Sequence, residues 1–148
     1  MIKIKKEIFI VFAILIVISG ADIGLEKFTQ KNFDEISEQL DLLENKILSE
    51  NKNIINNEKN NEENFDKDIV KSYINDFEKI HDKWKSKYDF YACFIEHDEL
   101  EKVELQMVSA NASLKMGDFR KAVDEIEKCK FIIKHIEEKD SLRAVNVF

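Results

Sequence analysis

The sequence predicts an all-α protein, with an N-terminal membrane helix followed by a bundle of about four amphipathic helices. Three observations support this fold class. The 148 residues include no proline and only three glycines, so the residues that tight β-turns require are scarce. An unbroken apolar run over residues 8–18 follows a lysine-rich start. Farther along the chain, apolar residues recur every three or four positions, which aligns them on one face of successive helices.

Residues 1–21 have the composition of an export segment. The apolar run is preceded by three lysines: Lys3, Lys5 and Lys6. Such lysines stay in the cytoplasm while the apolar segment enters the membrane. As a helix, residues 8–21 cover about 21 Å, which is short of the ~30 Å hydrocarbon core of a bilayer. Ser19 and Ala21 are small residues where a signal peptidase prefers them. Two alternatives therefore stay open, a retained membrane anchor or a signal peptide that is cleaved after Ala21.

Residues 22–148 are enough for one domain with its own core. Setting aside Lys3, Lys5, Lys6 and Glu7 leaves 20 basic and 29 acidic side chains, a net charge of −9. Acidity of this kind keeps a domain soluble, and it lacks the basic face that binding to phosphates requires. We therefore expect no nucleic acid among the partners.

The first amphipathic helix is expected over residues 22–50. Its apolar stripe consists of Leu25, Phe28, Phe33, Ile36, Leu40, Leu43 and Ile47. Residues 51–64 interrupt the pattern, because seven of these fourteen residues are asparagine, and they are expected to form a linker. A helical domain is expected over residues 65–148.

Three further helices are expected in this domain. The first extends from about Asp66 to Ile95, and its stripe is rich in aromatic residues: Val70, Tyr73, Phe77, Ile80, Trp84, Tyr88, Tyr91 and Ile95. Asp98 and Glu101 match a capping box at the start of the next helix. Gly117 can adopt the left-handed conformation that ends this helix, and Asp118 can cap the last one. Amphipathic helices joined by short turns pack most simply as an antiparallel bundle.

Several motifs in the second half of the chain occur together in a known family. They are Trp84, the string Phe94-Ile95-Glu96-His97-Asp98-Glu99-Leu100, Gly117-Asp118 with Ala122, His135-Ile136-Glu137-Glu138 and the closing Asn146-Val147-Phe148. In this order they resemble the bacterial domain-of-unknown-function family 4363, over roughly residues 65–148. The chain departs from the family pattern in its longer asparagine-rich linker and in Phe65, where the family tends to carry tryptophan. The resemblance implies one N-terminal membrane segment and a helical remainder, which favours the anchor, and it implies no activity.

His97, Asp98 and Glu99 carry the chemical groups that bind zinc or transfer protons. Adjacent side chains on a helix point about 100° apart, so these three cannot converge on one ion. A metal site would need His81 or His135 to approach from another helix. We therefore expect capping and interhelical hydrogen bonds here, and no catalytic residue, metal or cofactor.

Aromatic residues crowd the end of the long second helix: Trp84, Tyr88, Phe90, Tyr91 and Phe94. Trp84 is expected in the core. A single stripe cannot bury all five, so this stretch is the candidate interaction surface. Cys93 and Cys129 would lie in a compartment that permits a disulfide, but their different levels on the helices favour buried free thiols.

These observations favour a membrane-anchored, extracytoplasmic and non-enzymatic module that binds or scaffolds another envelope protein. The predicted topology places the N-terminus in the cytoplasm and residues 22–148 outside. The alternative function is a helical bundle of the cell envelope that binds a ligand or a metal, in which His97, Asp98 and His81 or His135 meet in a polar pocket.

Overall fold

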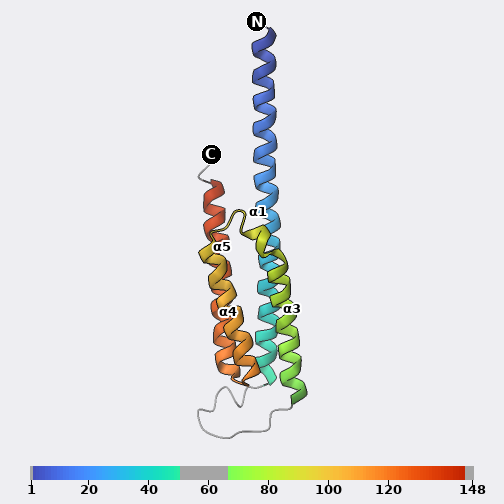
Figure 1. Cartoon of the computed structure of the whole chain (residues 1–148), viewed down its shortest axis with the longest axis vertical. Helices are drawn as coiled ribbons and strands as arrows, with labels where there is room; N and C mark the ends of the chain where they lie inside the picture. The colour runs from blue at the N-terminus through green and yellow to red at the C-terminus, as the bar shows by residue number, and fades with distance from the viewer. Residues whose placement is uncertain (1, 51–66, 146–148) are drawn as a thin grey trace. The chain divides into compact units, whose positions relative to one another are not determined.

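The computed structural model describes residues 2–50 and 67–145 (Figure 1). Every regular element within these ranges is a helix: α1 (Ile2–Glu50), α3 (Lys67–Tyr91), α4 (His97–Lys115) and α5 (Phe119–Val145). The linker predicted over residues 51–64 lies outside the described residues. The chain divides into two compact units, Met1–Asn32 and Phe33–Phe148.

The predicted fold class is wrong in its first element, the N-terminal membrane helix. α1 continues without a break from Ile2 to Glu50. In the part of the chain that the structure describes, no helix combines the length and the apolar character needed to cross a membrane. The physical reason is the shortness of the apolar run, since a span requires about 20 mostly apolar residues.

The first unit, Met1–Asn32, contains the N-terminal part of α1. The described apolar side chains of its lysine-preceded run, Ile10, Val11, Phe12 and Ile14, are each more than half exposed. Near the end of the unit, the side-chain amide of Asn32 donates a hydrogen bond to the carbonyl of Phe28, one turn earlier (2.7 Å). Leu25 and Phe28 were predicted to start the buried stripe, and both are exposed.

The second unit is an antiparallel helical bundle. α4 packs against both α3 and α5, and residues 33–50 of α1 complete the bundle through contacts with α3 and α5. Consecutive helices in this unit run in opposite directions (Figure 1). The arrangement follows from the short connections between α3 and α4 and between α4 and α5, which return the chain alongside itself.

The core of the bundle consists of one apolar stripe from each helix, close to the stripes predicted from the spacing. The buried residues are Phe33, Ile36, Leu40, Leu43 and Ile47 of α1; Tyr73, Phe77, Ile80, Trp84 and Tyr91 of α3; Leu100, Val103, Met107, Ala110 and Leu114 of α4; and Phe119, Ala122, Val123, Ile126, Cys129, Ile133 and Ile136 of α5. Tyr88, which was predicted in the same stripe as Trp84, is only half-buried.

The turn between α4 and α5 has the geometry that the sequence predicts. Gly117 has a φ of 73°, and its N–H donates to the Leu114 carbonyl while the Asp118 N–H donates to the Ser113 carbonyl. These two bonds form a Schellman motif. The Asp118 carboxylate then accepts a hydrogen bond from the backbone N–H of Lys121 (3.0 Å), so it caps α5.

The start of α4 differs from the prediction. Its N-cap residue is Glu96, and no side chain makes a capping hydrogen bond there. The predicted capping box of Asp98 and Glu101 is therefore not formed. Because the helix begins at His97, Asp98 lies inside the first turn. There its negative charge is attracted to the positive end of the helix dipole, which stabilises the helix.

Candidate functional site: the aromatic corner between α3 and α4

Two of the five aromatic residues of the candidate surface are buried in the core. Trp84 and Tyr91 lie two turns apart on one face of α3, and neither is exposed. Phe33 of α1 packs against both, with ring centroids 5.8 Å from Trp84 and 4.9 Å from Tyr91. The Trp84 and Tyr91 rings are themselves 5.3 Å apart. These three rings form a fixed base rather than a surface.

The other aromatic residues lie at the end of α3 and in the turn that follows. Phe94 is 38% exposed and meets Phe90 edge to face, with centroids 4.8 Å apart. Tyr88 is half-buried and meets the ring of His97 edge to face at 6.0 Å, with its hydroxyl 3.4 Å from His97 Nδ1. We call Tyr88, Phe90, Phe94 and His97 the aromatic corner.

The turn after α3 fixes the position of Phe94. α3 ends at Tyr91, and the carbonyl of Tyr91 accepts hydrogen bonds from the N–H groups of Phe94 (3.1 Å) and Ile95 (2.9 Å). Ile95 is buried in the core, whereas Phe94 is turned toward solvent. The buried side chain of Ile95 therefore anchors the turn, and the neighbouring side chain of Phe94 is left accessible to solvent.

The aromatic corner has an acidic surround. Asp89, Glu96, Asp98 and Glu101 are all exposed and flank it in the sequence. Burial raises the pKa of Tyr88, and the negative charges of Glu101, Glu104 and Asp89 raise it further. Glu96 forms an ion pair with Lys139 of α5 (2.9 Å), so the negative charge beside this apolar knob comes mainly from Asp89, Asp98 and Glu101.

Two hydrogen-bond donors lie unpaired in the base of the corner. Trp84 Nε1 and the Tyr91 hydroxyl are buried and have no partner among the described residues. Burial, with the nearby charge of Glu35, raises the pKa of Tyr91 to about 12. The Tyr91 hydroxyl therefore keeps its proton at neutral pH.

The three histidines have three different surroundings. His81 is 7% exposed at its side chain and donates from Nε2 to Glu104 Oε1 of α4 (2.7 Å). His97 belongs to the aromatic corner, and His135 is exposed on α5. Within residues 2–50 and 67–145, no three histidine, cysteine or acidic side chains form a group that could hold a metal ion.

A known family matches most of the chain. Residues 27–147 match the family described as a domain of unknown function (DUF4363). The chain belongs to this family. The match confirms the resemblance seen in residues 65–148 and extends it to the stripe of α1, so the bundle of residues 33–145 falls within the DUF4363 domain. No curated protein and no solved structure matches the chain.

The two cysteines of the DUF4363 domain are both free thiols. Cys129 is buried, and burial together with the charge of Glu104 raises the pKa of its thiol to about 12. Cys93 was predicted to be buried as well, but it is exposed, because α3 ends two residues before it and the turn points outward.

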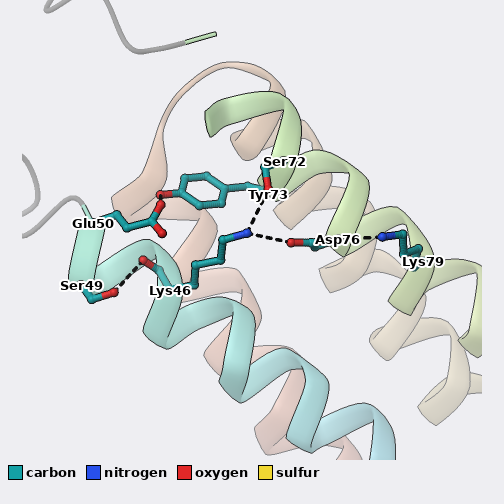
Figure 2. A network of polar contacts seen from close by, with 7 residues as sticks. All are labelled: Lys46, Ser49, Glu50, Ser72, Tyr73, Asp76 and Lys79. Atoms are coloured by element: carbon teal, nitrogen blue, oxygen red, sulfur yellow. Dashed lines mark hydrogen bonds and ion pairs between the residues drawn. The ribbon is translucent and has the colours of Figure 1, made fainter. Parts of the chain in front are cut away.

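A polar cluster that was not predicted joins α1 to α3 in the DUF4363 domain (Figure 2). Lys46 of α1 donates to Ser72 Oγ and to Asp76 Oδ2, both at 2.9 Å. The Tyr73 hydroxyl donates to Glu50 Oε2 (2.6 Å). The hydrogen bond from Lys46 is the main reason that the pKa of Asp76 is lowered. The i, i+4 spacing of Ser72 and Asp76 places both side chains on the same side of α3, which is the signal that the sequence contains. Their partner, Lys46, is known only once α1 is placed beside α3.

A single lysine joins α1 to α5. Lys130 forms ion pairs with Asp41 and Glu44 of α1, which lie on the same side of that helix. Together with the Lys46 cluster, this triad fixes residues 33–50 between α3 and α5. Both clusters serve the packing of the bundle.

Proposed function

We propose that this chain is a non-enzymatic protein-interaction module that docks a partner protein at its aromatic corner. The observation that carries the proposal is Phe94, which is exposed but stacks on Phe90 beside a fully buried aromatic base. Large aromatic side chains provide much of the binding energy at protein interfaces. A ring that is already held in place loses little conformational entropy when a partner covers it.

The charges around the corner indicate the chemistry of the partner. An apolar pocket would receive Phe94, and basic residues at the rim of that pocket would face Asp89, Asp98 and Glu101. Such charge complementarity increases the association rate and makes it sensitive to salt. We therefore expect binding to weaken as the salt concentration rises.

We also propose that the module works outside the cytoplasm, with an envelope protein as its partner. The lysines before residues 8–18 and the small residues Ser19 and Ala21 support export by a signal peptide that is cleaved after Ala21. Mass spectrometry of the protein from its native host tests this: a mature chain of residues 22–148 is expected. A mass that includes Met1 in the exported protein would contradict it.

Site-specific photo-crosslinking tests the docking proposal. A photoreactive phenylalanine analogue at position 94 should yield one adduct of defined mass in cells, and Phe90→Ser should reduce its yield several-fold. The same analogue at Phe131, which is 73% exposed on α5, is the matched control and should yield no such adduct. Equal labelling from both positions, or none from position 94, would refute the proposal.

A further inference from the structure

The outward face of α4 carries apolar residues in its middle that the core does not explain. Six of the exposed positions of α4 follow each other at spacings of 3, 4, 3, 4 and 3 residues: Asp98, Glu101, Leu105, Val108, Ala112 and Lys115. This is the heptad spacing of a helix that packs along a second helix. Leu105 is 61% exposed and Val108 is 52% exposed, although α4 has a separate buried stripe that faces the core.

The order of charges along this face is self-complementary. Asp98 and Glu101 lie at its N-terminal end, the apolar residues lie in the middle, and Lys115 lies at its C-terminal end. In a second copy that runs antiparallel, with the two-fold axis between Leu105 and Val108, Leu105 faces Val108 of that copy. The same register places Asp98 opposite Lys115 at both ends, whereas a parallel register would oppose like charges.

We propose that two copies of this chain associate through antiparallel packing of their α4 helices on this face. A two-fold axis makes every contact occur twice, as in most homodimers. Other large exposed apolar residues of the bundle, such as Leu42 of α1 and Phe131 of α5, have only polar residues three and four positions away on their helices. Lys115 also pairs with Glu78 of its own chain (2.9 Å), and its side chain, which is 52% exposed, can contact a second carboxylate.

The expected dimer is weak, because six positions span only about 26 Å of one helix. Interfaces of this small size support transient association, with a dissociation constant on the order of tens of micromolar. The dimer shares Asp98 and Glu101 with the acidic surround of the aromatic corner but does not use Phe90 or Phe94. Leu105→Lys therefore tests the dimer alone, and Phe90→Ser tests the proposed docking function alone.

Sedimentation of the full chain over a range of concentrations tests the proposal. Wild-type protein should pass from monomer to dimer, and Asp98→Lys or Lys115→Glu should each raise the dissociation constant at least tenfold by opposing like charges. An equimolar mixture of these two variants should recover dimers. In the mixed pair, each contact between position 98 of one chain and position 115 of the other joins a lysine to a carboxylate. Circular dichroism verifies that each variant keeps its helical content.

Two further variants make the result specific to this face. Leu105→Lys should abolish the dimer, and Phe131→Ser, which removes an even more exposed apolar residue from α5, should leave it unchanged. A wild-type chain that stays monomeric at ~0.5 mM overturns the proposal. The exposed face of α4 would then be a candidate contact for a different protein. A dimer that survives Leu105→Lys would overturn it as well.

Discussion

Glu137 of α5 is placed where its negative charge destabilises the bundle. Its Oε1 atom is buried and has no hydrogen-bond partner among the described residues. Burial raises the pKa of this carboxyl from 4.5 to about 7, and the charges of Asp34 on α1 and of Glu138 add to the effect, while Lys134 opposes it. The carboxyl is therefore protonated more readily in the folded chain than in the unfolded chain.

The direction of the pH dependence follows from this raised pKa. The stability gained from protonated Glu137 is fully present below pH 4.5 and is lost as the pH rises through about 7. A rise of the pKa from 4.5 to about 7 corresponds to at most ~3.5 kcal/mol, at ~1.4 kcal/mol per pKa unit. Because the side chain is only half-buried, solvent screening reduces the expected effect to about 1–2 kcal/mol.

Glu137→Gln should therefore stabilise the protein at pH 8 by about 1–2 kcal/mol and should leave its stability unchanged near pH 4.5. Urea denaturation at pH 4.5, 6, 7 and 8, with the m-value held constant, measures the difference between the variant and the wild type. Glu127→Gln, which changes an exposed carboxylate of the same helix, is the matched control and should shift stability by less than ~0.5 kcal/mol. A difference that does not vary with pH, or a Glu137→Gln variant that is less stable than wild type at pH 8, would refute the reasoning.

Three other predictions concern stability and thiol chemistry. Gly117→Ala should cost ~1 kcal/mol in urea denaturation, from backbone strain alone, because its φ is 73° and an added Cβ would contact nothing within 4 Å; an unchanged midpoint would contradict this. His81→Ala should cost about 2 kcal/mol by leaving Glu104 unpaired, whereas the double variant with leucine at both positions should stay within ~1 kcal/mol of wild type; equal losses would contradict the pairing. Iodoacetamide at pH 8 should label Cys93 within minutes and Cys129 only after unfolding, as followed by mass spectrometry; equal rates would show that Cys129 is accessible.

The sequence predicts the helices of the bundle well because each stripe is a local property. Spacings of three and four residues identify Phe77, Met107 and Ile126 as core positions without knowledge of any partner helix. The prediction of an N-terminal membrane helix was wrong, and it relied on the local composition of the chain. The composition of residues 8–18 is typical of a membrane segment, but helix length and polarity decide whether a membrane is crossed.

The candidate site was predicted only in part. Crowding of aromatic residues identified the region, and the stripe placed Trp84 and Tyr91 in the core. The exposure of Phe94 depends instead on the end of α3 at Tyr91 and on the turn that follows. The pair of His81 and Glu104 joins two helices, so no spacing within either helix reveals it. The exposed heptad of α4 was missed because charged residues occupy its two ends.

The contact of Lys130 with α1 has a consequence for the order of folding. Its two partners, Asp41 and Glu44, lie 89 and 86 residues away in the chain, whereas α4 and α5 are joined by a short turn. Closing so long a loop costs more entropy than pairing neighbouring helices. We therefore expect α4 and α5 to associate first and α1 to dock last. In native-state hydrogen exchange, the amides of residues 33–50 should then open at lower free energy than those of the α4–α5 hairpin.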